Sequence, residues 1–192
     1  AGTPARLREG AVPVLVEGPL DALAIAASGE GGRFLGLAPL GTSLTEEQAH
    51  QLATLAHEAG TSSVVAADAD PAGQRATQRA YWLLTQHDLT PTTVTWAPGS
   101  DPADTLARDG AHALRQRLDA ATPLSTHLLD SGFDGTAREA LRGGAAVVAA
   151  GPPALWDDGT RRIADATGLP VPVVRRELAR ALHDRSADVR AV

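Results

Sequence analysis

Short apolar runs alternate with segments of helical periodicity over roughly the first 120 residues of the chain. The apolar runs predict four strands, at residues 12–17, 33–38, 63–67 and 92–97. The intervening segments predict helices at residues 20–28, 45–59 and 71–87, and a short helix after Pro102. This order predicts an α/β fold: a four-stranded, mostly parallel sheet flanked by helices on both faces, with right-handed crossovers.

Residues at the ends of the predicted helices support this assignment. Thr45 and Gln48 have the spacing of a capping box, and Gly60 stands where that helix should end. Pro71 is favourable in the first turn of the helix that follows the third strand.

The alternation of strands and helices stops after residue 122. Helical stretches separated by glycine and proline follow, near residues 124–129, 136–149, 154–166 and 173–182. Residues 145–150 also have the composition of a strand, which leaves a second interpretation open for that segment. We therefore expect an α/β domain at residues 1–122 and a small C-terminal helical appendage at residues 123–192.

Composition limits the class of protein. Of the 192 residues, 43% are hydrophobic but only 3% are aromatic, so we expect a core of Ala, Val and Leu. The absence of cysteine excludes disulfides and cysteine-based zinc sites. No apolar stretch reaches the length of about 18 residues that spans a membrane. No signal peptide opens the chain, so a cytoplasmic protein with no membrane partner is expected.

Two further features concern the chain as a whole. It begins at Ala1 rather than at a methionine, and we expect a piece of a longer protein or a processed chain. Its formal charge of −6 argues against a dedicated nucleic-acid-binding surface, and the acidic excess lies within residues 1–136. A bound divalent cation would offset part of that acidic charge.

Three acidic clusters, each placed just after a predicted strand, carry the candidate chemistry. Their members are Glu17 and Asp21, then Asp68 and Asp70, then Asp101 and Asp104. Ligands of open α/β sheets sit outside the carboxyl ends of the strands, so the clusters are expected to converge on one edge. Crowded carboxylates repel one another unless a cation lies among them, and Mg²⁺ prefers such oxygen ligands. The pattern predicts a magnesium site and, with it, phosphoryl-transfer chemistry.

Each cluster also has a structural interpretation. Glu17 is a candidate metal ligand or general acid/base with Asp21 in support, but Asp21 also suits the first turn of any helix. Asp68 and Asp70 can grip one ion from the same side of the chain, although Asp70 can also cap the helix at Pro71. An ordinary helix start does not explain Asp68, because a carboxylate at the end of a buried strand is costly without a partner.

The remaining candidates are weaker. Asp101 and Asp104 lie in a turn-forming segment that would cap a helix in any protein. Gly41 and Thr42 are candidates for a phosphate-binding loop, although a turn before a capped helix is the favoured interpretation. A further pair, one helical turn apart, would hold a phosphate backbone or simply remain solvated: Arg75 and Arg79.

Taken together and in this order, the clusters resemble the Toprim domain shared by topoisomerases, DnaG-type primases and some nucleases. Glu17 matches the family glutamate, and Asp68 and Asp70 match its Asp-x-Asp pair. Four segments resemble elements of the DnaG-type primases: residues 17–22, 40–45, 68–76 and 98–104. The resemblance covers roughly residues 12–110 and implies a compact parallel sheet of four strands.

Several departures from the family pattern stand out. Pro19-Leu20 replaces the usual aromatic-Met pair, Ala69 replaces a glycine, and Thr105 stands where the last element has an acid. The zinc-binding module and the basic amino-terminal half of such primases are missing. Some mobile-element proteins that resemble this family join a Toprim domain to relaxase or helicase parts, and this chain is expected to come from such a protein or from a primase.

The resemblance implies a primase-type nucleotidyltransferase, incomplete as this fragment, that acts in primer synthesis for DNA replication or plasmid mobilisation. One or two Mg²⁺ ions, with Mn²⁺ as a substitute, would be held by these carboxylates: Asp68, Asp70 and Asp101 or Asp104, with Glu17 as a further ligand or proton-transfer group and Asp21 as a second ligand or outer-shell residue. The catalytic set is Glu17, Asp68 and Asp70. The implied partners are single-stranded DNA template, nucleotides and further domains of the parent chain, including a helicase or relaxase.

Two other functions remain open from the sequence. A Toprim nuclease or topoisomerase would use the same carboxylates to cleave a phosphodiester, but a topoisomerase also needs a tyrosine nucleophile. Tyr81 is the only tyrosine, and its apolar neighbours predict that it is buried. Alternatively, the domain serves as a non-catalytic DNA-docking module of a larger mobilisation protein.

Overall fold

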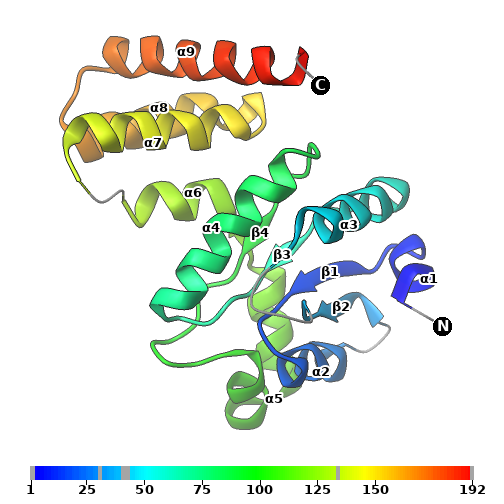
Figure 1. Cartoon of the computed structure of the whole chain (residues 1–192). Helices are drawn as coiled ribbons and strands as arrows, with labels where there is room; N and C mark the ends of the chain where they lie inside the picture. Colours follow the sequence, from blue (N-terminus) through cyan, green and yellow to red (C-terminus); the bar gives the residue numbers. More distant parts are fainter. Residues whose placement is uncertain (1–2, 30–31, 40–43, 133–134, 191–192) are drawn as a thin grey trace. The chain divides into compact units, whose positions relative to one another are not determined.

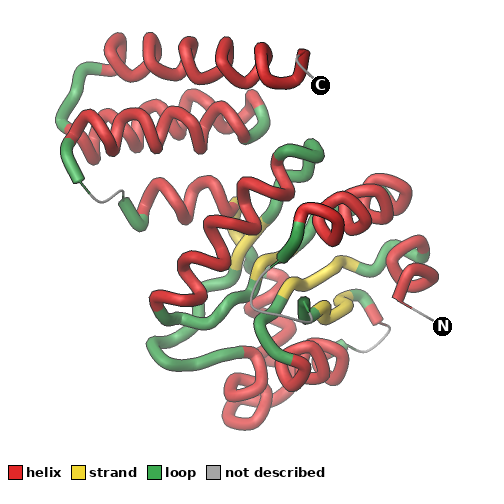
Figure 2. Tube along the Cα trace, viewed as in Figure 1, coloured by secondary structure: helices red, strands yellow, loops and turns green. Residues whose placement is uncertain are grey.

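The computed structural model describes residues 3–29, 32–39, 44–132 and 135–190. Internal contacts divide the chain into two compact units, Ala1–Leu124 and Ser125–Val192. The first is an α/β unit and the second is helical, as Figure 2 shows.

A mostly parallel sheet forms the centre of the first unit. Its strand order is β2-β1-β3-β4-β5, and the first four strands run parallel. The strands are β1 (Val12–Leu15), β2 (Phe34–Leu37), β3 (Val64–Val65), β4 (Thr92–Thr93) and β5 (Thr122–Pro123). The predicted α/β class is confirmed.

The predicted number of four strands is wrong, because β5 adds a fifth that pairs antiparallel with β4. The sequence pattern missed β5 for a physical reason. It is two exposed residues long, too short to show an alternation, and one of them is Pro123, which is tolerated only at a sheet edge.

Helices cover both faces of the sheet (Figure 1). On one face, α2 (Pro19–Ser28) packs against α5 (Pro102–Asp119). On the other face, α3 (Glu46–Ala59) contacts α4 (Pro71–Thr85), and α1 (Thr3–Arg8) lies against α3. The helix predicted after Pro102 is longer than expected: it continues through a kink at Gly110, whose φ of 84° suits glycine.

The core is built mostly from Ala, Val and Leu, in agreement with the low aromatic content of the chain. Alternate residues of a strand point to opposite faces of the sheet. Val14 and Val64 therefore join Ile25 of α2 and Leu114 of α5 in one apolar cluster, together with Trp96. The helices of the other face bury mainly small residues, including Ala49, Ala53, Ala56 and Ala80.

The predicted signals at the ends of α3 are confirmed. The Thr45 hydroxyl accepts a hydrogen bond from the Gln48 amide (3.2 Å), and the Gln48 side chain accepts one from the Thr45 amide (3.0 Å). Gly60 ends the helix with a left-handed φ of 64°.

The second unit consists of helices throughout its described residues. They are α6 (Leu124–Asp130), α7 (Ala137–Ala150), a 3-10 turn at Pro153–Leu155, α8 (Trp156–Thr167) and α9 (Val171–Arg190). Helix α7 packs on both α8 and α9, and a Cβ at Gly159 would come within 3.2 Å of Val148 Cγ1. The interpretation of residues 145–150 as a strand is wrong, because Val147 and Val148 face the apolar interior of a helical bundle.

None of the described helices combines the length and the apolar character needed to cross a membrane.

Candidate metal centre

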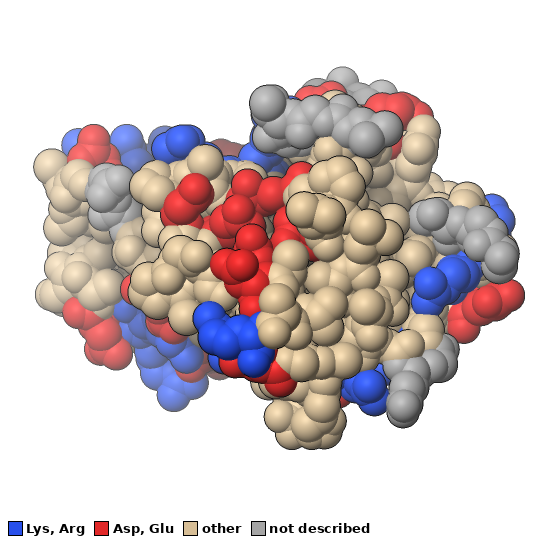
Figure 3. Space-filling view, turned by 90° about the horizontal axis from the view of Figure 1, so that it is seen from below, with Lys and Arg blue, Asp and Glu red and all other residues tan. Residues whose placement is uncertain are grey.

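The three acidic clusters lie at one edge of the sheet. Strands β1, β3 and β4 are parallel neighbours, so the loops that follow them leave the sheet at the same edge. Figure 3 shows a strip of acidic side chains gathered on one face of the molecule. Convergence of this kind brings together residues far apart in the sequence.

Glu17 joins the first loop to the second. Its Oε1 atom accepts a hydrogen bond from the backbone amide of Asp68 across 3.0 Å. Helix α4 begins close to this contact: a Cβ at Gly73 would overlap the Asp68 carbonyl oxygen and lie 2.8 Å from Glu17 Oε1. Only glycine therefore allows the first turn of α4 to approach so closely.

Asp70 and Asp101 are both helix caps. Asp70 Oδ1 accepts a hydrogen bond from the Gly73 amide (2.7 Å), and Asp101 Oδ1 accepts one from the Asp104 amide (2.6 Å). In each case a proline follows at the first helical position. Each capping bond uses one oxygen of the carboxylate, so capping and metal binding are compatible roles.

Asp68 stands at the centre of the cluster. Its Oδ1 atom is buried and has no hydrogen-bond partner among the described residues. Burial, followed by the negative charges of four nearby carboxylates, raises the pKa of Asp68 to about 6; the four are Glu17, Asp21, Asp101 and Asp70. Carboxylates crowded in this way favour a bound cation, because a positive charge among them would offset their mutual repulsion.

The residues suit a hard divalent cation. The donor set consists of carboxylate oxygens, and the buried Asp68 Oδ1 has an unused acceptor site. Among the described residues, no three acidic or histidine side chains already stand at metal-ligand spacing. Side-chain rotation would therefore have to accompany binding.

Asp21 and Asp104 occupy different environments. Asp21 is 7% exposed, and burial raises the pKa of its carboxyl group. Asp104 is exposed, and its charge is not among those that raise the pKa of Asp68. Instead, after the hydrogen bond and charge of Asp109, Asp104 raises the pKa of Arg108. Asp21 is thus among the carboxylates that raise the pKa of Asp68, whereas Asp104 acts on the exposed Arg108.

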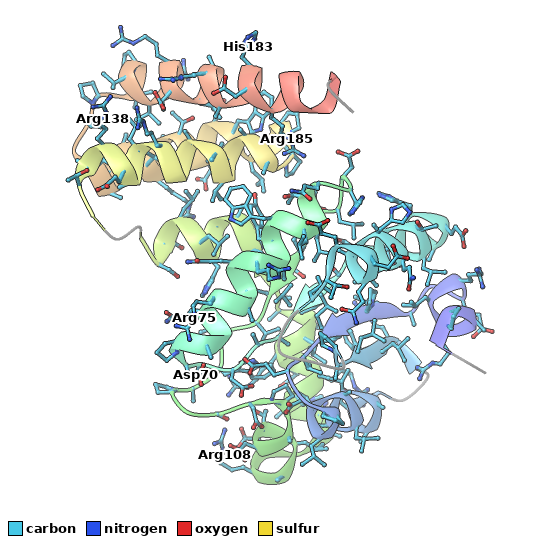
Figure 4. All side chains as sticks on the ribbon, viewed as in Figure 1. Asp70, Arg75, Arg108, Arg138, His183 and Arg185 are labelled. Atoms are coloured by element: carbon cyan, nitrogen blue, oxygen red, sulfur yellow. The ribbon has the colours of Figure 1, made fainter. Side chains whose placement is uncertain are left out.

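The predicted phosphate-binding residues differ in their contacts. Arg75 is exposed on α4, and Figure 4 places it at the same end of that helix as Asp70. Arg79 donates from Nε to the Leu44 carbonyl across 2.9 Å, which ties α4 to the chain before α3. Gly41 and Thr42 lie outside the described residues.

Two contributors to the site were missed by sequence reasoning. Gly73 permits the approach of α4 to Asp68, and its signal was the Asp-Pro-Ala-Gly start of a helix directly after an acidic pair. The amide of Ala103 donates to Asp21 Oδ1 at 3.3 Å. This second contact has no sequence signal, because any residue except proline has a backbone N–H.

Sequence comparisons agree with this geometry. Residues 14–106 match the family model described as Toprim-like. The chain is 31% identical over 117 residues to the DNA primase of Borreliella burgdorferi, covering 61% of this chain and 21% of that protein. It is 27% identical over 121 residues to the DNA primase of Clostridium acetobutylicum, covering 63% and 19%. The chain therefore spans about a fifth of the length of the curated relatives it matches.

Solved structures extend the similarity to the fold. The RNA polymerase domain of Mycobacterium tuberculosis primase DnaG superimposes with a TM-score of 0.67 and 25% identity, covering 84% of this chain and 53% of that one. A DnaG primase catalytic domain bound to single-stranded DNA gives a TM-score of 0.60 at 21% identity, covering 86% and 54%. With the acidic edge described above, these similarities show that the chain contains a Toprim-like domain of the DnaG primase type.

Proposed function

We propose that the α/β unit is the metal-binding part of a primase-type nucleotidyltransferase, which acts in primer synthesis. The observation that carries the proposal is Asp68, whose buried Oδ1 has no hydrogen-bond partner among the described residues. Burial raises the pKa of this carboxyl group, and the negative charges of four further carboxylates raise it further, to about 6 in total. A fold that needed only structural contacts would not keep so many negative charges together.

Asp68, Asp70 and Asp101 are the residues that would hold one or two Mg²⁺ ions, for which Mn²⁺ can substitute. When bound, the metal supplies positive charge that polarises nucleotide phosphates and activates the primer 3′-hydroxyl. Binding requires ionised Asp68, so a proton leaves this carboxyl group whenever it becomes a ligand below about pH 6. Asp70 stays oriented by its bond to the Gly73 amide.

Glu17 would act beside these ligands. One of its oxygens holds the Asp68 loop through the backbone amide, which fixes the side chain at the sheet edge. The other oxygen is then available as a further ligand or to accept the proton of the attacking hydroxyl. Arg75 lies at the same end of α4 as Asp70, and it would bind a phosphate of the nucleic acid.

The partners follow from the same account. Single-stranded DNA template and nucleotides are the substrates, consistent with the related catalytic domain that was solved with single-stranded DNA. The acidic charge of this chain means that basic surface for the template comes from other parts of a longer parent protein. That protein would be a replicative primase, or a mobile-element protein that also contains a helicase or relaxase.

A second function uses the same carboxylates. A Toprim nuclease would stabilise a leaving oxygen at the metal site during cleavage of a phosphodiester. A topoisomerase-type reaction is disfavoured because Tyr81 is only 1% exposed and cannot reach a DNA phosphate. A DNA-docking module without catalysis would leave the crowding around Asp68 unexplained.

The test compares two products of one template. The parent protein is incubated with unprimed single-stranded DNA, nucleotides and Mg²⁺, as wild type, as Asp68→Asn/Asp70→Asn and as the exposed control Asp165→Asn. Primer synthesis that is lost only in the double variant supports the proposal. Cleavage of the template with the same dependence supports the nuclease instead, and activity that survives the double variant contradicts both.

A further inference from the structure

Asp21 lies between the first turns of two helices. Its Oδ2 atom accepts a hydrogen bond from the Gly18 amide across 3.2 Å, within the start of α2. Its Oδ1 atom accepts one from the Ala103 amide across 3.3 Å, in the first turn of α5. The side chain is buried, with 7% of the residue exposed, and both of its oxygens face backbone donors. One carboxylate thus joins segments that are 82 residues apart.

The start of α5 explains why this contact is needed. Pro102 at the first helical position has no N–H, and the Asp104 amide is already bonded to Asp101 Oδ1. The Ala103 amide is the remaining donor of this turn, since the helical bonds begin with the Thr105 amide and the Asp101 carbonyl. Asp21 supplies the acceptor that α5 itself does not provide.

We propose that Asp21 is a positioning residue, which holds Asp101 in the acidic cluster through the Ala103 amide, and is not itself a metal ligand. This inference rests on the proposed function. It also divides the work of the first cluster: Glu17 holds the second loop through the Asp68 amide, whereas Asp21 holds the third. The sequence suggested Asp21 either as a second ligand or as an outer-shell residue; the two backbone hydrogen bonds, one on each oxygen, favour the second role.

The first test needs no metal. Amide hydrogen exchange is measured residue by residue by NMR in EDTA on wild type, Asp21→Asn and Glu17→Ala. Asparagine offers one carbonyl oxygen instead of two, so the Ala103 or the Gly18 amide should exchange roughly tenfold faster. Glu17→Ala is the reciprocal control, because it removes the acceptor of the Asp68 amide and should leave Ala103 unchanged. Unaltered exchange at both Gly18 and Ala103 in folded Asp21→Asn would overturn the inference.

The second test separates positioning from ligation. Mn²⁺ affinity is measured by calorimetry on Asp21→Asn, Asp101→Asn and the double variant. Positioning through Asp101 predicts that Asp21→Asn weakens binding roughly tenfold, and that it adds nothing once Asp101 has been replaced. A further loss in the Asp101→Asn background, or no effect of Asp21→Asn at all, would overturn the inference.

The two tests also keep this inference apart from the function it rests on. If wild type binds no Mn²⁺ under any condition, the proposed function fails. In that case Asp21 cannot be a positioning residue for a metal ligand either, and faster exchange at Ala103 would leave only a structural contact between two loops. If Mn²⁺ binds and is lost in Asp68→Asn, but Asp21→Asn acts independently of Asp101, the function stands and this inference alone fails.

Discussion

The backbone amide of Asp68 donates a hydrogen bond to Glu17 Oε1 across 3.0 Å, although the two residues are 51 positions apart. The bond joins the loops that follow β1 and β3, two neighbouring parallel strands. A carboxylate that would otherwise be repelled by Asp68 is thereby fixed beside it. The acidic edge is therefore built on hydrogen bonds from backbone amides to its carboxylates.

Replacement of Gly73 by alanine should disturb this arrangement. A Cβ would overlap the Asp68 carbonyl oxygen and crowd Glu17 Oε1, so the first turn of α4 would have to move. We expect a loss of about 1–3 kcal/mol in the free energy of unfolding, measured with urea.

Gly29→Ala is the matched control for this experiment. Its φ is −103°, and among the described residues the nearest atom to an added Cβ is the Gly32 amide nitrogen, 3.8 Å away. Its free energy of unfolding should lie within about 0.5 kcal/mol of the wild-type value, or slightly above it. Equal stability of Gly73→Ala and Gly29→Ala would contradict the close approach of α4.

The stability of the metal-free protein should depend on pH through Asp68. The pKa of this carboxyl group is raised from 3.8 in the unfolded chain to about 6 in the fold. Between these values the folded state binds the proton and the unfolded state does not. This group's contribution to stability therefore falls as the pH rises from 4 to 6, by an amount that solvent screening of this half-buried side chain reduces.

Denaturant unfolding in EDTA across pH 4–7 measures this contribution. Asp68→Asn cannot titrate, so the difference between wild type and this variant isolates the carboxyl group from all others. Asparagine should become relatively more stabilising as the pH rises through this window. If the difference in free energy of unfolding between wild type and variant stays constant with pH, the pKa of Asp68 is not raised in the fold.

The two arginines of α4 should have separable roles. Arg75 is exposed near Asp70, so Arg75→Ala should weaken binding of the parent protein to single-stranded DNA and lower the salt slope by about 1. Arg79 instead bonds the Leu44 carbonyl, so Arg79→Ala should lower the free energy of unfolding by about 1 kcal/mol and leave the salt slope unchanged. Fluorescence anisotropy at several salt concentrations distinguishes them, and an exchange of the two effects would contradict the assignment.

The sequence predicted the elements that carry strong periodic or capping signals. The helix ending at Gly60 was predicted to the residue, because Thr45 and Gln48 form a local capping box and Gly60 adopts a left-handed φ. Strand β5 was missed because two exposed residues have no periodicity. Strands β3 and β4 are shorter than the apolar runs that predicted them. Residues next to the hydrogen-bonded ones are also buried, so an apolar run does not mark where a strand ends.

The candidate site could likewise be predicted from the sequence only in part. Carboxylates after buried strands are visible in the sequence, and the structure gathers Glu17, Asp21, Asp70 and Asp101 around Asp68. What those carboxylates bond to is not visible, because the amides of Asp68 and Ala103 are ordinary backbone groups. Their proximity depends on strand order, which only the folded chain determines.

The most direct test of the central claim is Mn²⁺ binding by calorimetry, in the presence of nucleotide, on wild type, Asp68→Asn/Asp70→Asn and Asp165→Asn. Asparagine at position 70 can still cap α4, so the double variant should remain folded. A metal site at this edge of the sheet predicts saturable binding to wild type and Asp165→Asn that is lost in the double variant. No binding to folded wild type at millimolar Mn²⁺, or equal binding by all three proteins, would contradict a metal site at this edge of the sheet.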